Sequence, residues 1–122
     1  MNIDRVLAFF AVVLLPCVAV AMEDSLTRFR LAGEPSNQTT CRSLDAVLAR
    51  LHTVTVRAGD VEITSAGGIE GRMKPVRDGV YRVGFELSGL SLDVVADLGG
   101  VPRTLTVIDR QLGCKWQANP ER

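Results

Sequence analysis

The chain has 122 residues, and its 14 basic and 14 acidic side chains give a formal net charge of zero. This length suits a single domain and argues against a multidomain enzyme, while the balanced charge argues against a strongly basic nucleic-acid binder. Although 47% of the residues are apolar, much of this content lies before residue 22. The remainder has the composition of an ordinary, rather lean globular domain.

The first 21 residues have the layout of a secretory signal peptide. Arg5 precedes an unbroken apolar run from Val6 to Leu15, and small residues follow at Ala19 and Ala21. We therefore expect cleavage after Ala21 and export to the periplasm or the extracellular space. A retained membrane anchor is the alternative, although the run is shorter than the ~20 apolar residues that span a bilayer.

Cleavage at this position would leave two cysteines, Cys41 and Cys114. In an exported protein such a pair predicts one disulfide, which here would join the start of a helix to the last strand. Two free thiols, or a bridge to another chain, are the alternatives. The third cysteine, Cys17, lies in the leader, where the preceding Pro16 argues against a lipoprotein signal.

Residues 22–39 form a mixed N-terminal segment and linker ahead of a single domain over residues 40–122. Ser25 to Leu31 is compatible with a short helix, and the polar stretch from Gly33 to Thr39 is typical of a surface loop. Asn37 begins an N-x-T sequon, which matters only if the source glycosylates exported proteins.

Residues 41–52 show helical spacing of their apolar side chains. Cys41, Leu44, Val47, Leu48 and Leu51 fall on one helical face. This pattern predicts one helix that ends near residue 52 and packs its apolar face on the rest of the domain.

After residue 52 the apolar period changes from 3.6 to 2, which is typical of strands. Pairing the strands around successive turns keeps the apolar residues on one face, as an antiparallel meander requires. The expected turns are Gly59-Asp60, Ala66–Gly68, Arg77–Gly79, Ser88-Gly89 and Gly99-Gly100.

Particular pairs follow from these turns. The predicted pairs are Val56 with Ile63, Val61 with Met73, Gly71 with Phe85, Phe85 with Leu92, Val94 with Leu105, and Val107 with Trp116. Lys74 falls near Arg82, and because like charges across a strand pair are unfavourable, we expect a bulge near Pro75.

The predicted fold is α+β: one N-terminal helix packed on a curled antiparallel meander of six or seven strands, with one disulfide. A twisted sheet of this size is expected to curl around the helix. The pattern leaves open whether the curl stays half open or closes into a barrel.

The motifs of the common catalytic sites are missing from the sequence. His52 is the only histidine and lies where the predicted helix ends, which favours a dipole interaction over catalysis. Neither clustered metal ligands nor a glycine-rich phosphate loop is seen. We therefore expect no catalytic residue, metal or cofactor, and we regard an enzyme as the less favoured class.

Charge is distributed unevenly over the outer face of the predicted sheet. The first strands carry Arg57, Glu62 and Arg72, which are expected to form a cross-strand ladder. The later strands present a weakly apolar face, which predicts either a partner site or an area covered by residues 22–39. The residues of this possible partner face are Val95, Thr104, Thr106 and Ile108.

These features favour a small exported, non-enzymatic binding domain for an unknown protein or small ligand, with no nucleic-acid partner and no transmembrane segment in the mature chain. The binding surface would be the outer face just described or a concave mouth beside the helix. Two alternatives remain: a small exported hydrolase that uses carboxylates, and a structural subunit associated with the cell envelope.

Overall fold

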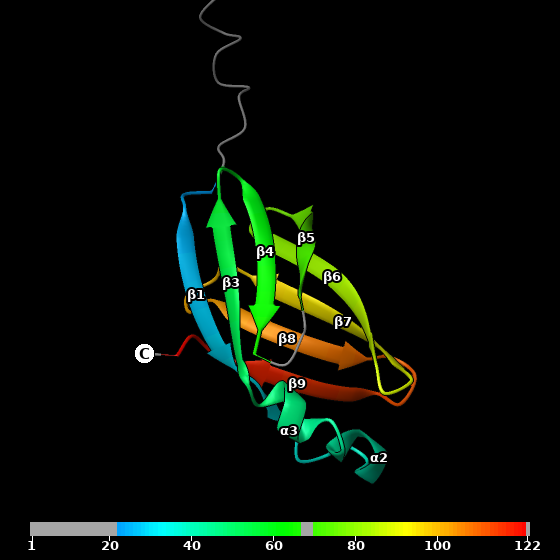
Figure 1. Cartoon of the computed structure of the whole chain (residues 1–122). Helices are drawn as coiled ribbons and strands as arrows, with labels where there is room; N and C mark the ends of the chain where they lie inside the picture. Colours follow the sequence, from blue (N-terminus) through cyan, green and yellow to red (C-terminus); the bar gives the residue numbers. More distant parts are fainter. Residues whose placement is uncertain (1–21, 67–69, 122) are drawn as a thin grey trace, which may run out of the picture.

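The computed structural model describes residues 22–66 and 70–121 (Figure 1). The predicted signal peptide therefore lies outside the described residues. The elements are β1 (Ser25–Arg30), β2 (Ala32–Gly33), α2 (Thr39–Arg42), α3 (Asp45–Leu48), β3 (Leu51–Arg57), β4 (Asp60–Ser65), β5 (Glu70–Arg77), β6 (Val80–Leu87), β7 (Leu90–Asp97), β8 (Thr104–Asp109) and β9 (Cys114–Ala118).

The strands form one antiparallel, nearly closed sheet in the order β1-β3-β4-β5-β6-β7-β8-β9-β2. The two edge strands β1 and β2 are consecutive in the chain and are separated only by Leu31. β1 pairs with β3, whereas β2 pairs with β9. The segment from Ser25 to Gly33 therefore joins both edges and gives the sheet its barrel-like form.

The segment from Ser25 to Gly33 forms the seam that closes the sheet, and contacts along this seam extend beyond the strand pairs. Phe29 lies opposite His52 in β3 and also forms a bridge with Pro120, close to the end of the chain. Nearer the start of β1, Arg103 Nη1 donates to Ser25 Oγ at 3.0 Å and to Thr27 Oγ1 at 2.9 Å. The loop between β7 and β8 thus holds the first half of β1.

The α+β prediction is wrong, because the chain is mostly β, with 59% of residues in strands and 8% in helices. The short helix expected within residues 25–31 is the strand β1. The alternation in this segment explains the error: Ser25, Thr27 and Phe29 are more buried than Leu26 and the arginines between them. This is the period of a strand rather than of a helix.

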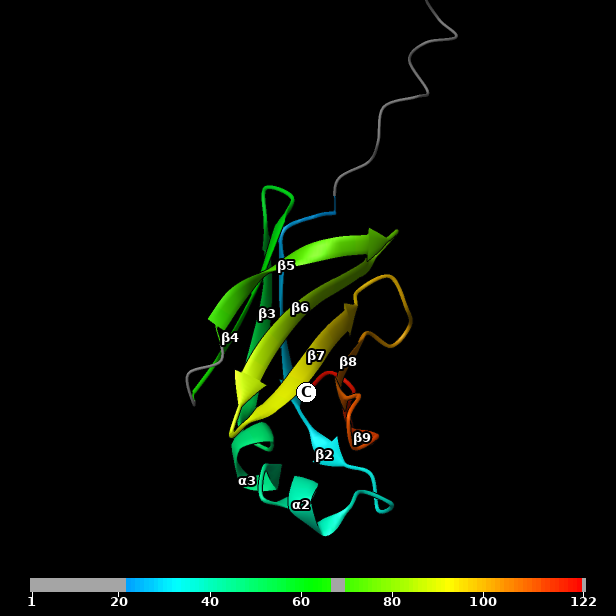
Figure 2. The same cartoon turned by 90° about the vertical axis from the view of Figure 1, so that its right-hand side faces the viewer.

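The expected helix over residues 41–52 is also wrong, because two single turns, α2 and α3, take its place. Its apolar face was identified correctly, since Cys41, Leu44 and Leu48 are buried. These turns lie at one end of the sheet and not across its inner face (Figures 1 and 2). Side chains from the strands already fill the interior, including fully buried Phe29 and Trp116.

The predicted strand register is partly confirmed. Val61 pairs with Met73, Phe85 with Leu92, and Val107 with Trp116, as expected. The bulge near Pro75 is confirmed as well, with Lys74 directly opposite Arg82.

Two hairpins differ from the prediction by two residues, which leaves every side chain on its expected face. Val56 pairs with Val61, because the turn uses Ala58 and Gly59, both with positive φ, instead of Gly59-Asp60. Leu105 pairs with Ala96, because the connection between β7 and β8 is longer than two residues.

The first register shift also changes the outer face. Arg57 lies opposite Asp60, and Glu62 lies between Thr55 and Arg72. The expected ladder of Arg57, Glu62 and Arg72 is therefore not formed.

The predicted disulfide joins Cys41 in α2 to Cys114 in β9, with their Cα atoms 6.4 Å apart. Two polar side chains support the same junction. Trp116 Nε1 donates to Asp45 Oδ1 at 2.7 Å, which ties α3 to β9. Asn37 is buried and makes two hydrogen bonds with the backbone of Lys115, so its sequon amide is not presented at the surface of the fold.

Candidate functional site

The predicted partner face lies on the outer side of β7 and β8. Val95 is directly opposite Thr106, and Ile108 is opposite Asp93. Thr104 continues the same face at the start of β8. Each of the four predicted side chains is half-buried, so the face is partly covered by its own neighbours.

A charged cluster borders this face. Asp93 is almost fully buried because two arginines cover its carboxylate: Arg82 contacts Oδ1, and Arg110 Nε lies 2.7 Å from Oδ2. Arg82 is opposite Val95 on the neighbouring strand. The predicted face therefore continues directly into a fixed group of charges.

A hollow lies at the end of the sheet opposite the helices. This mouth pocket has a volume of about 690 Å³ and is lined by Met22, Tyr81 and the segment from Pro75 to Gly79. Sequence analysis placed a concave mouth beside the helix, whereas the helical end is filled by buried Leu44 and Leu48. Met22, Asp78 and Tyr81 were not predicted as site residues, although the proline within β5 gave a signal of an irregular strand.

The β5–β6 turn and its neighbour fix the shape of the mouth pocket. Gly79 has φ +75°, and its carbonyl accepts a hydrogen bond from the Leu98 N–H at 2.7 Å. A Cβ at this position would come within 2.9 Å of Gly99, so only glycine fits here without displacing the second loop. The turn is therefore anchored on the loop that carries Arg103.

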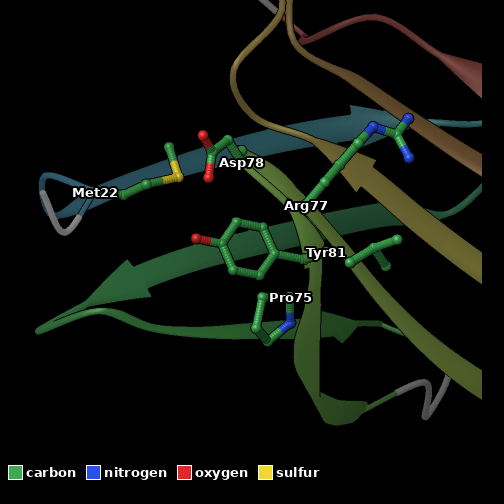
Figure 3. A pocket seen from close by; sticks show the side chains of 7 residues that line it. Met22, Pro75, Arg77, Asp78 and Tyr81 are labelled. Atoms are coloured by element: carbon green, nitrogen blue, oxygen red, sulfur yellow. The ribbon is translucent and has the colours of Figure 1, made fainter. Parts of the chain in front are cut away.

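Figure 3 shows how the side chains of the pocket are directed. The Tyr81 ring lies beside Pro75, and its hydroxyl points to the side where Met22 and Asp78 meet. The Arg77 guanidinium extends away from these groups. Apart from Arg77, the polar side chains of the lining are the Asp78 carboxylate and the Tyr81 phenol, next to apolar Met22 and Pro75.

The disulfide has a buried carboxylate beside it. Asp109 is fully buried, and its Oδ2 lies 4.0 Å from Cys41 Sγ. One ligand atom from each of Cys41, Asp109 and Cys114 falls within 4.8 Å of the others, as in a metal site. The two sulfurs are bonded to each other, so neither is the free thiolate that metal binding needs.

A carboxylate hydrolase would require a buried acid in a concave pocket. Among the described residues, the buried acids are Asp93 and Asp109. Asp93 is held by two arginines on the outer face and Asp109 lies at the disulfide, so neither lines the mouth pocket.

His52 is buried at the start of β3, four residues after the last residue of α3. Its Nε2 donates to the Leu48 carbonyl at 2.8 Å, because a carbonyl can only accept. Its Nδ1 has no hydrogen-bond partner within the described part of the chain. Burial therefore lowers the pKa of His52 below its ordinary value of 6.5.

The buried histidine predicts a loss of stability in mild acid. The unfolded chain takes up a proton near pH 6.5, whereas the folded protein keeps the ring neutral to a lower pH. The contribution of His52 to the free energy of unfolding is therefore complete above this pH. As the pH is lowered further, the free energy of unfolding decreases by at most about 1.4 kcal/mol per pH unit. Urea unfolding at a series of pH values measures this slope.

His52→Gln is the matched variant, because an amide nitrogen can still donate to the Leu48 carbonyl but does not titrate. We expect its free energy of unfolding to fall less than that of the unaltered protein between pH 7 and pH 5. Equal slopes for the two proteins would show that His52 does not carry the acid sensitivity.

Comparison with known proteins gives no relative: no family model, curated protein or solved structure matches the chain. None of the helices in residues 22–66 and 70–121 is long and apolar enough to cross a membrane.

Proposed function

We propose that the chain is a small exported binding domain without enzymatic activity, and that it binds its ligand in the mouth pocket. The observation that carries this proposal is the contrast between a filled sheet interior and an open pocket of about 690 Å³ at its mouth. Pockets that combine apolar walls with a few placed polar groups are the usual form of small-ligand sites. The predicted leader and the disulfide are both compatible with export.

The lining of the pocket favours a ligand that joins an amine to an apolar body. Asp78 offers a negative charge beside the Tyr81 ring, and an aromatic face also attracts a cation (Figure 3). Met22 and Pro75 provide apolar surface next to this ring. A protein partner that inserts a lysine-like or aromatic amine side chain has the same chemistry.

Tyr81 is the only tyrosine of the chain, which makes the pocket directly observable. Incorporating 3-fluorotyrosine gives one ¹⁹F resonance, which we expect to shift in a saturable manner with phenethylamine. The matched anion 3-phenylpropionate should cause a much smaller shift, because Asp78 would repel it.

Two variants locate the binding. Asp78→Asn should abolish most of the phenethylamine response, whereas Glu86→Gln, at an exposed position of β6 away from the pocket, should retain it. An unchanged ¹⁹F resonance, or an equal response to the anion, would overturn the proposal for the mouth.

The outer face of Val95, Thr104, Thr106 and Ile108 is the second docking surface that we propose. It is separated from the mouth pocket, so Val95→Asp and Ile108→Asp should leave the phenethylamine response intact. Loss of a co-purifying partner in these two variants alone would place that partner on β7 and β8.

A further inference from the structure

Three cationic side chains lie close together on the outer face of the β5–β6 hairpin, next to its bulge. A groove of about 340 Å³ is lined by Arg72, Lys74, Arg82, Gly84, Val83 and the bulge residues Pro75 and Val76. Three of these side chains are cationic, and the lining contains no carboxylate. This groove lies on the opposite face of the hairpin from the Tyr81 ring, because residues 81 and 82 alternate in the strand.

The cations of the groove are placed against their mutual repulsion. Lys74 lies directly opposite Arg82, and like charges in such cross-strand positions destabilise a sheet. Arg72 is two residues from Lys74 on the same strand and therefore shares its face. An anion bound between them would relieve this repulsion.

The acidic neighbours of the groove neutralise these charges only in part. Asp93 is shared between Arg82 and Arg110, so one carboxylate serves two cations. Arg72 faces Glu62 on the neighbouring strand, and its Nη2 lies 3.9 Å from Asp60 Oδ2. The side chains of Arg72 and Asp60 are both more than 60% exposed. Ion pairs between such exposed side chains contribute little to stability. Lys74 has no ion pair within the described residues.

The shape of the groove gives an anion access to these side chains. Gly84 forms a floor without a side chain, and only the Leu92 carbonyl comes near the position of an added Cβ, at 3.8 Å. Val76 is 53% exposed and provides an apolar wall. Asp93 holds Arg82 in place before any ligand arrives, which reduces the entropy lost on binding.

We infer that this groove binds a phosphate monoester with a small apolar group, with the phosphate between Lys74, Arg82 and Arg72 and the apolar group against Val76. The bulge at Pro75 and Val76 is what separates this groove from the mouth pocket, since both residues line the two hollows. The inference does not depend on binding at the mouth.

The test is a titration of the ¹⁵N-labelled protein with phenyl phosphate, followed by two-dimensional NMR. We expect saturable shifts at the amides of Lys74, Arg82 and Gly84, and weaker binding as salt is raised. Lys74→Gln should weaken binding about fivefold, the effect of about 1 kcal/mol for one charge near the surface. Arg28→Gln removes an equal charge from an exposed position of β1 and should leave the affinity unchanged.

A second variant tests the shape without changing the charge. Gly84→Val adds a side chain on a strand, where a β-branched residue is favoured, and its Cβ would meet only the Leu92 carbonyl at an ordinary contact distance of 3.8 Å, so the fold should be kept. We expect it to block phenyl phosphate by filling the floor of the groove. If Lys74→Gln and Gly84→Val bind phenyl phosphate as well as the control Arg28→Gln does, the proposal is overturned. Chemical shifts scattered over the surface would overturn it as well.

Vesicles distinguish the two sources of a phosphate monoester. Shifts or sedimentation with phosphatidylcholine vesicles that contain phosphatidic acid, absent with phosphatidylcholine alone and lost in Gly84→Val, would assign the groove to a lipid headgroup. Binding of phenyl phosphate without vesicle binding would assign it to a soluble ligand, and failure of both would refute the groove. The ¹⁹F resonance of Tyr81 reports on the mouth separately, so failure at one site is distinguishable from failure at the other.

Discussion

Phe29→Ala is expected to lower the free energy of unfolding by about 3–5 kcal/mol, the usual cost of removing a fully buried aromatic side chain. Phe29 is 0% exposed, pairs with His52 of β3 and forms a bridge with Pro120, after the end of β9. The substitution therefore leaves a cavity at the seam that closes the sheet. Urea unfolding followed by the fluorescence of Trp116, the sole tryptophan, measures this loss.

Leu26→Ala is the matched control for this prediction. Leu26 belongs to the same strand but is 53% exposed and points outward. We expect a change within about 0.5 kcal/mol. Equal effects of the two substitutions would mean that β1 is not a strand with one buried face.

Removal of the disulfide by Cys41→Ala with Cys114→Ala should destabilise the protein by about 4 kcal/mol. The bridge spans 73 residues, and a loop of this length loses much of its unfolded-state entropy when it is closed. The bridge also fastens the two helical turns to β9. Denaturant unfolding of the oxidised protein and of the double variant measures the difference.

Reductant is the control for the disulfide. It should bring the unaltered protein close to the stability of the double variant and should leave the double variant unchanged. In the absence of reductant, thiol labelling of the mature, unfolded protein should find no free cysteine. Two labelled thiols, or a stability that reductant does not affect, would contradict the bridge and weaken the case for export.

The alternation of apolar side chains predicted the faces of the sheet better than its architecture. Val61 with Met73 and Val107 with Trp116 pair as expected, because short turns leave few choices of register. The error of two residues at Val56 arises because the position of the turn was misjudged, and the error at Leu105 because the length of the connection was misjudged. Periodicity does not detect such errors, since a shift of two keeps every side chain on its face.

Closure of the sheet was not predictable from local patterns. Residues 25–33 pair with strands on both sides, one of them at the far end of the chain. Their sequence shows a half-buried segment but does not show which partners complete it. Residues 41–48 show the related limit: the apolar spacing identified the buried side chains, whereas their arrangement in two short turns depends on the space left beneath the closed sheet.

The candidate sites show a similar division. The clash between Lys74 and Arg82 and the irregularity at Pro75 were visible in the sequence, and both belong to the outer groove. The mouth pocket was not visible in the sequence. Met22 and Tyr81 lie far apart in the chain, and both line the pocket because β1 brings the N-terminal segment beside the β5–β6 turn.

The central claim is that the segment from Ser25 to Gly33 closes the sheet by pairing with β3 on one side and with β9 on the other. Interstrand nuclear Overhauser effects test it most directly on the mature protein. We predict contacts from Phe29 to both His52 and Pro120, together with contacts between Ala32 and Gln117. Contacts to β3 alone, with none between Ala32 and Gln117 or between Phe29 and Pro120, would show an open sheet and contradict the account.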